Sequence, residues 1–283
     1  MTPGMSDTPL LEVRDITAGF GAVTVLHGVS FEVPRGSIGG IFGLNGAGKS
    51  VTMKCLAGVV PTRSGSVLFE GEDITTMSPE KRVAHGMGHV PQGRQVFPGL
   101  TVEENLRLGA YTLRRKNKSR YAAALDGVFD RFPILRQRRG QLAGTMSGGQ
   151  QASLAVARAL INEPQLILVD EPSAGLSPVA TLELDEVLQA VAKTGVTMVL
   201  VEQNIAFGLS LVDTAHLMQT GTVVHSGPVA ELDDQTLATH LGIGRVLQAA
   251  AGSALAARQA PQAKAKAKPR TKAKEKPGAR RTA

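Results

Sequence analysis

The sequence predicts an α/β fold, because short apolar stretches alternate with helical stretches over most of its 283 residues. Residues 38–42 form an apolar run that leads into a glycine-rich segment and then into helix-favouring residues. A second apolar run, residues 166–169, ends in two acids, and a third covers residues 196–201. Strands that alternate with helices pair in parallel, so we expect a buried, mainly parallel sheet at the centre of the molecule.

The N-terminal third is expected to be rich in strands, with breaks at Gly21 and at His27-Gly28. Its predicted elements are strands at 10–20, 29–33, 67–69 and 88–90, a turn at 34–36, and a helix that starts at 78–80. These residues therefore predict an N-terminal β subdomain.

A helical insert is predicted at about 93–146. Thr101 and Glu104 have the T-x-x-E spacing of a capping box, and a second helical stretch follows at 121–132. Basic residues are concentrated in this insert: Arg114, Arg115, Lys116, Lys118, Arg120, Arg136, Arg138 and Arg139. Two interpretations are open for them, a solvated face or a contact with a membrane subunit or with lipid headgroups.

After the insert, strands and helices alternate again. The predicted elements are a helix that ends at 161, a strand at 166–170, a helix at 178–193, a strand at 196–202, a hairpin that turns at Thr220-Gly221, and a helix at 232–241. No internal repeat is visible.

The composition is that of a soluble globular protein, with 42% apolar and 19% charged residues. No run approaches 18 apolar residues, and the N-terminus has no basic segment followed by an apolar one, so we expect neither a membrane span nor a secretory signal. Cys55 is the single cysteine and is expected to be a buried thiol. His85 and His89 are spaced as zinc ligands can be, but Gly86 and Gly88 argue against the helix that this spacing needs.

The C-terminal segment, residues 248–283, is expected to be a disordered basic tail. Residues 258–283 contain ten Lys or Arg and one Glu, a balance of +9 within a net charge of +7, so the other 257 residues carry −2. Alanine, lysine and proline without apolar periodicity cannot build a core. Inert solvation and transient attraction to anionic lipid or nucleic acid both remain open for this tail.

The glycine-rich segment fits G-x-x-x-x-G-K-[ST], the phosphate-binding loop. Its residues are Gly43, Leu44, Asn45, Gly46, Ala47, Gly48, Lys49 and Ser50. Glycines let the backbone N–H groups point inward, and the N-terminus of the following helix adds positive potential. We expect Lys49 to reach the β- and γ-phosphates of ATP and Ser50 to bind Mg²⁺.

Two acids follow the strand at 166–170. A buried parallel strand would place Asp170 and Glu171 at its carboxyl end, where ligands bind in open α/β sheets. We expect Asp170 to hold Mg²⁺, directly or through water, and Glu171 to act as the general base on the attacking water.

A second anion-binding segment is predicted at Ser147, Gly148, Gly149 and Gln150, where a serine and two glycines begin a helix. In isolation an ordinary N-capped helix would explain these residues. Two γ-phosphate sites in one chain make sense only when the second serves another subunit.

The segments GLNGAGKS, Gln92, MSGGQ and LILVDE, in this order, resemble the nucleotide-binding subunit of ATP-binding cassette (ABC) transporters, over about residues 10–244. VPQGRQVFPGLTVEENL, EPSAGLSP and VEQN further resemble one of the two ATPases of branched-chain amino acid importers, and the related amide and urea importers also fit. The resemblance implies a P-loop NTPase of the ABC ATPase type, with its domain at 8–247.

The resemblance also implies roles for single residues. Phe20 would stack on adenine, and Gln92 would touch Mg²⁺ and the attacking water. Residues 147–150 would cover the γ-phosphate that the opposite subunit binds, and residues 175–178 would cross the dimer interface. Gln203 lies where most of the family has the switch histidine.

Two further positions depart from the family pattern. Val51 replaces a usual Ser or Thr at the α-phosphate, and Met146 replaces a usual Leu. Losing a hydroxyl contact matters more than the near-isosteric exchange of Met for Leu.

We therefore expect an ATP-hydrolysing subunit that drives import, peripheral on the cytoplasmic face of the cell membrane. Its expected partners are two membrane-spanning permease subunits, a second ABC ATPase subunit and, indirectly, an external solute-binding protein. A non-transport ABC ATPase acting on ribosomes or DNA, and a cassette that binds ATP without hydrolysing it, are the alternatives.

Overall fold

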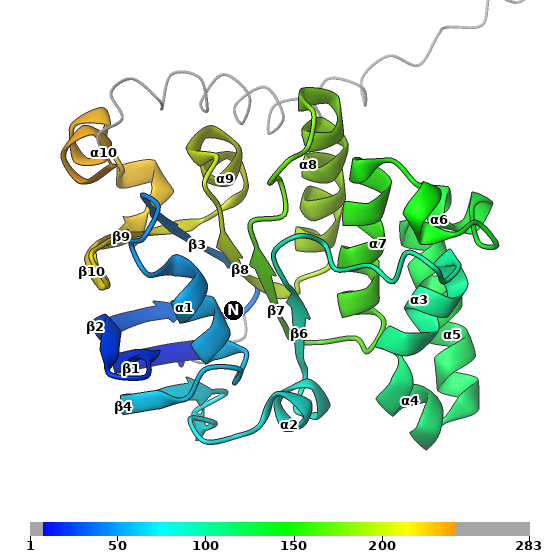
Figure 1. Cartoon of the computed structure of the whole chain (residues 1–283), viewed down its shortest axis with the longest axis horizontal. Helices are drawn as coiled ribbons and strands as arrows, with labels where there is room; N and C mark the ends of the chain where they lie inside the picture. The colour runs from blue at the N-terminus through cyan, green and yellow to red at the C-terminus, as the bar shows by residue number, and fades with distance from the viewer. Residues whose placement is uncertain (1–7, 242–283) are drawn as a thin grey trace, which may run out of the picture.

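The computed structural model describes residues 8–241, which form two sheets and a set of helices (Figure 1). The predicted tail at 248–283 lies outside the described residues, as do the last residues of the predicted ATPase domain. No helix in the described range is both long enough and apolar enough to cross a bilayer.

The first sheet is antiparallel, in the order β2-β1-β4-β5. Its strands are β1 (Leu11–Phe20), β2 (Val23–Val33), β4 (Thr62–Phe69) and β5 (Glu72–Asp73). The predicted break at His27-Gly28 is wrong, because β2 continues through it. The left-handed Gly28 (φ +79°) is absorbed as an irregularity in the pairing with β1 between Ile16 and Thr17.

The second sheet has the order β10-β9-β3-β8-β7-β6 and is parallel except for β10 at its edge. Its strands are β3 (Ile38–Gly43), β6 (Met87–Val90), β7 (Leu166–Asp170), β8 (Thr197–Val201), β9 (Thr214–Gln219) and β10 (Thr222–Pro228). β9 and β10 form the predicted hairpin, in which Thr220 and Gly221 both have positive φ, as a type I′ hairpin turn requires. The carboxyl ends of β3, β7 and β8 therefore meet at one edge.

Helix α1 (Lys49–Leu56) lies between the two sheets and packs into their shared core. β7 and β8 divide their side chains between two cores: Leu168 and Val199 face α1, whereas Ile167 and Met198 face the helices on the other side. Because successive residues of a strand point to opposite faces, a strand buried on both faces must be mainly apolar, and in these two strands only the terminal residues Asp170 and Thr197 are polar.

Helix α2 (Pro79–Ala84) lies next to β6, whereas the other helices cover the far face of the second sheet and form the helical region to its side (Figure 1). These other helices are α3 (Val102–Gly109), α4 (Tyr111–Lys116), α5 (Lys118–Arg131), α6 (Pro133–Gln137), α7 (Gly148–Leu160), α8 (Pro178–Ala192), α9 (Ile205–Leu211) and α10 (Asp234–Leu241), with 3₁₀ turns at Ala143–Thr145 and Val229–Glu231. The capping box of Thr101 and Glu104 is present at the start of α3. Helix α9, which the side chain of Asn204 caps, was not predicted.

Candidate functional site

The loop between β3 and α1 is shaped to hold an anion. Gly46 (φ +83°) and Gly48 (φ +103°) have left-handed backbones that only glycine adopts easily. The buried Lys49 Nζ donates hydrogen bonds of 2.8 Å to the carbonyl of Gly43 and 3.2 Å to that of Leu44, so the loop surrounds the ammonium group. Burial lowers the pKa of Lys49, and the nearby carboxylates oppose that shift.

A cavity of about 390 Å³ opens at this loop. Its lining comes from five separate segments of the chain: Val25, residues 45–51, Gln92, Glu171 and Gln203. Predicted site residues that are up to 158 positions apart in the sequence are therefore brought together at the carboxyl edge of the second sheet.

Glu171 and Gln92 are in direct contact. Gln92 Nε2 donates to Glu171 Oε2 at 2.6 Å, and the backbone N–H of Glu171 donates to the carbonyl of Val201 at 2.9 Å. Glu171 has a left-handed backbone (φ +44°), which turns the chain sharply at the end of β7. Its carboxylate is therefore held at the cavity and can accept a proton there.

Asp170 lies one residue earlier and is buried. Burial and then the neighbouring Glu171 raise the pKa of Asp170 to about 6, against the effect of Lys54 and Lys49. Its Oδ1 has no hydrogen-bond partner among the described residues. A buried carboxylate oxygen without a partner needs a cation or a donor, which makes Asp170 a metal-ligand candidate.

These residues fit a magnesium ion. Mg²⁺ is usually held by one or two carboxylates together with substrate phosphates and water. The orphaned Asp170 Oδ1, with the side chains of Ser50 and Gln92 on the adjoining segments, supplies oxygen ligands of that kind. In the described part of the chain, no cluster of three His, Cys, Asp or Glu could hold a metal without such phosphates.

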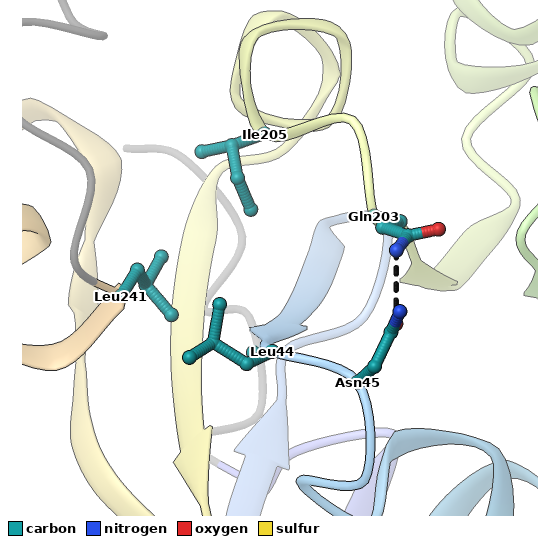
Figure 2. A pocket seen from close by; sticks show the side chains of 6 residues that line it. Leu44, Asn45, Gln203, Ile205 and Leu241 are labelled. Carbon is teal, nitrogen blue, oxygen red and sulfur yellow. Dashed lines mark hydrogen bonds between the residues drawn. The ribbon is translucent and has the colours of Figure 1, made fainter.

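Gln203 reaches the phosphate-binding loop from the end of β8. Its Nε2 donates to Asn45 Oδ1 at 2.9 Å, as the dashed line in Figure 2 marks. The two residues also border a neighbouring pocket of about 340 Å³, into which the apolar side chains of Leu44, Ile205 and Leu241 project (Figure 2). Gln203 therefore lies beside the phosphate-binding loop and lines the cavity in which a phosphate would bind.

The segment 147–150 begins α7 and does not line this cavity. Ser147 Oγ accepts a hydrogen bond from the N–H of Gln150, and Gln150 Oε1 accepts one from the N–H of Ser147. A Cβ on Gly149 would lie 3.2 Å from Ala180 Cβ and 3.4 Å from Ala180 Cα, so glycine favours the close packing of α7 against α8. The helix N-terminus is separate from the phosphate-binding loop of the same chain.

Phe20, which is 52% exposed at the end of β1, also lies outside the cavity lining.

Two functional candidates escaped the sequence analysis. Arg94 Nη2 donates to the carbonyl of Ala174 at 3.0 Å, and a Cβ on Gly148 would come within 3.1 Å of Arg94 Nη1. Arg94 thus joins the segment after Gln92 to the loop after β7 and lies against the start of α7; its sequence context carried no signal for this contact.

The second candidate is Glu202, which is 1% exposed and accepts hydrogen bonds from Ser173, Gln203 and Asn204. Burial raises its pKa, and these hydrogen bonds act in the opposite direction. The signal was available, because an acid directly after an apolar strand is the same feature that identified Asp170.

The basic residues of the helical insert are partly paired on the surface. Arg139 makes two hydrogen bonds to Glu103, Arg136 pairs with Asp130, and Arg120 pairs with Glu163. Exposed pairs of this kind contribute little stability, so they leave both interpretations of the insert open.

Comparison with known proteins gives a consistent result. A profile of the ABC transporter family matches residues 26–174, which is more than half of the chain. The high-affinity branched-chain amino acid transport ATP-binding protein BraG of Pseudomonas aeruginosa is 40% identical over 215 residues, covering 76% of this chain and 91% of that protein. The probable branched-chain amino acid transport ATP-binding protein LivF of Archaeoglobus fulgidus is 36% identical, covering 79% of this chain and 94% of its own length.

Solved structures agree at the level of the fold. A nucleotide-free ATP-binding cassette from an ABC transporter superposes with a TM-score of 0.72 at 25% identity, covering 86% of this chain and 98% of that one. An ADP-bound conformation of an ATP-binding cassette gives 0.71 at 26% identity, covering 87% and 99%. The glycine loop, the acids after β7 and these matches together assign the chain to the ABC transporter family, as one of its ATP-hydrolysing subunits.

Proposed function

We propose that the protein energises the import of branched-chain or other hydrophobic amino acids. The observation that carries the proposal is the gathering of Lys49, Glu171 and Gln203 around one cavity, in a chain that is 40% identical to BraG. The site itself is built for ATP, and the relatives BraG and LivF supply the substrate class through their names. Urea or short amides are the alternative cargo.

Within the cavity, we assign nucleotide binding to the phosphate-binding loop and ATP hydrolysis to the residues that line the cavity beside this loop. The N–H groups of residues 43–51 and the ammonium of Lys49 would bind the phosphates, and Phe20 would stack on adenine. Glu171 would accept the proton of the attacking water, while Gln92 and Gln203 would orient that water and the γ-phosphate. Ser50, Gln92 and Asp170 would hold Mg²⁺, whose charge would offset that of the phosphates.

A second ATPase subunit would complete the site. Ser147, Gly148, Gly149 and Gln150 begin a helix that does not line the chain's own cavity. In a head-to-tail pair, this N-terminus would cover the γ-phosphate bound by the partner. We therefore propose that the pair closes around ATP and reopens after hydrolysis.

We place the working protein at the inner face of the cell membrane, bound to two permease subunits, with residues 8–247 as the ATPase domain. Each ATPase of the pair would act on the permease, and an external solute-binding protein would deliver the cargo. The helical insert at 93–146 would contact a membrane subunit or lipid headgroups, and the tail at 248–283 would attract anionic lipid or nucleic acid.

The test is purification of the tagged full chain from its native membranes, followed by identification of the proteins that copurify. The complex is then reconstituted in proteoliposomes with Mg-ATP inside and radiolabelled leucine or urea outside, together with the copurifying solute-binding protein. ATP-dependent leucine uptake is the expected result. Uptake of urea without leucine would show that the transported substrate is urea rather than a hydrophobic amino acid. Copurification with ribosomes or DNA, without permeases, would refute the transport proposal.

A further inference from the structure

Glu202 is a buried carboxylate that the proposed mechanism does not use. It follows β8 directly, and both of its oxygens are occupied. Oε1 accepts a hydrogen bond of 2.9 Å from the N–H of Ser173. Oε2 accepts bonds of 2.9 Å from Ser173 Oγ, 3.0 Å from the N–H of Gln203 and 3.2 Å from the N–H of Asn204.

These hydrogen bonds join two loops that carry proposed catalytic groups. Ser173 lies two residues after Glu171, in the loop that leaves β7, whereas Gln203 lies in the loop that leaves β8. Glu171, Ser173, Glu202 and Gln203 all line one pocket of about 330 Å³ beside the phosphate-binding loop. The carboxylate of Glu202 therefore connects the loop of the candidate base, Glu171, with Gln203, the candidate hydrogen-bond donor to the γ-phosphate.

A purely structural role explains this arrangement poorly. Burying a carboxylate is costly, and an apolar side chain would fill the same space more cheaply. All four hydrogen bonds that Glu202 accepts within the described residues come from the two loops and none from the core. Its two oxygens hold together the two short segments that leave the adjacent strands β7 and β8.

We propose that Glu202 is a positioning residue, which locks the loop of Gln203 to the loop that follows Glu171. The inference rests on the roles proposed above for Glu171 and Gln203. One carboxylate, held at the end of β8, fixes the backbone of Gln203 from one side and that of Ser173 from the other. The side chain of Gln203 is then set against Asn45 of the phosphate-binding loop.

Glu202→Gln is the informative substitution, because it keeps the size and removes the charge. Its amide NH₂ cannot accept a hydrogen bond, so at least one of the two loops loses its partner. Small misplacements of catalytic groups cost up to about 10²-fold in rate. We expect kcat for Mg-ATP in the copurified complex to fall about 10- to 100-fold, with the Kd for a fluorescent ATP analogue within about threefold of the parent's.

A double-mutant cycle tests whether Glu202 acts through Gln203. If it does, Glu202→Gln adds little to the loss that Gln203→Ala already causes, because the group that it positions is gone. Losses that multiply would refute this coupling. Ser173→Ala, which removes one hydroxyl donor and keeps the fold, should lower kcat more mildly in the same direction.

Thr197→Val is the matched control at the opposite end of β8. Thr197 is fully buried and its Oγ1 accepts a hydrogen bond of 2.8 Å from the N–H of Gly36, far from the cavity lining. This variant should lower Tm while leaving kcat per folded molecule unchanged. If Glu202→Gln behaves in the same way, Glu202 is structural and the inference fails.

Three outcomes separate this inference from the proposed function. Slow turnover by both Glu171→Gln and Glu202→Gln, with ATP binding retained, supports both. Slow turnover by Glu171→Gln alone refutes only the positioning role, whereas parental turnover by Glu171→Gln refutes the proposed role of Glu171 as the base. If Glu202→Gln does not fold, Glu202→Asp and Ser173→Ala replace it in the same measurements of kcat and Kd. Glu202→Asp keeps the charge but has a shorter side chain.

Discussion

The side-chain amide of Gln92 donates a hydrogen bond of 2.6 Å to the carboxylate of Glu171, across 79 residues of sequence. The backbone of Glu171 is tied at the same time to Val201 on the neighbouring strand. The contact with Gln92 orients the candidate base toward the cavity and links it to the segment at which the helical insert begins. Removing the carboxylate should therefore affect chemistry rather than nucleotide binding.

Glu171→Gln should bind ATP and fail to turn it over. The carboxamide keeps the shape of the side chain but cannot take a proton from water, so hydrolysis should fall by about 10²-fold or more. Steady-state phosphate release and equilibrium binding of a fluorescent ATP analogue, both in the assembled complex, measure the two effects.

Two variants calibrate this result. Lys49→Ala should instead weaken nucleotide binding, because it removes the ammonium enclosed by the loop. Glu163→Gln changes an exposed acid, paired with Arg120 on the surface, and should leave both quantities unchanged. Parental turnover by Glu171→Gln would remove this residue from the role of base.

Gln203→Ala should slow hydrolysis by about 10²- to 10³-fold with little change in ATP affinity, because one preorganised donor at a developing charge is lost. A glutamine amide has no group that titrates near neutrality, so it can hold a phosphate but cannot shuttle a proton. Gln203→His, which keeps a donor, should retain much of the activity. The measurement must use the full complex, since an intact second site could mask the loss; parental activity of Gln203→Ala there would make Gln203 a bystander.

His216 should make the protein sensitive to acid. The side chain is buried beside Phe31, and its Nδ1 lies 2.7 Å from Ser226 Oγ. Burial, with a smaller contribution from His225, lowers the pKa of His216 to about 4. The unfolded chain, with an ordinary histidine pKa near 6.5, therefore binds more protons, so the stability conferred by the neutral ring is complete above about pH 6.5 and is lost as the pH falls toward 4.

His216→Gln should reduce the pH dependence of the free energy of unfolding by up to one proton, or about 1.4 kcal/mol per pH unit, within that window. Urea denaturation at pH 7.5, 6 and 5 measures it. His89, whose pKa burial also lowers to about 4, should leave a residual slope in the variant. Equal slopes for parent and variant would show that His216 is protonated without cost.

Arg82 should stabilise the end of α1 that is remote from the cavity. The buried guanidinium donates to the carbonyls of Cys55 and Leu56 in the last turn of α1, and to those of Met77, Ile74 and Thr75. Arg82→Met should lower the free energy of unfolding by about 2–4 kcal/mol, since several buried carbonyls lose their donor. Arg82→Lys should recover only part, because one ammonium cannot reach five carbonyls; full recovery in urea denaturation would mean that charge alone is needed.

Truncation after residue 250 should leave ATPase activity and Tm nearly unchanged. The two hydrophobic cores of the described chain are built from residues up to Leu241, and the removed segment carries the ten basic residues of 258–283. Any affinity for anionic vesicles or DNA should fall, and in the full chain it should weaken with salt. Loss of hydrolysis on truncation would contradict this prediction.

The sequence by itself identified the phosphate-binding loop, the apolar strands and the acids that follow β7. Each of these is a local pattern in which residue type and spacing are dictated by the chemistry or by burial on both faces of a sheet. The same patterns placed the capping box of Thr101 and the turn at Thr220-Gly221, because caps and tight turns depend on adjacent residues alone.

Only the tertiary structure decided which side chains meet. Gln92 and Glu171 come together because β6 and β7 are neighbours, and Gln203 reaches Asn45 because β8 lies beside β3. The continuity of β2 through Gly28 likewise depended on pairing with β1, which overrides a local break. The proposed role of Glu202 also depends on the tertiary structure, because its hydrogen bonds join the loops that follow two neighbouring strands. The order of strands in a sheet is a property of the folded chain that no local spacing encodes.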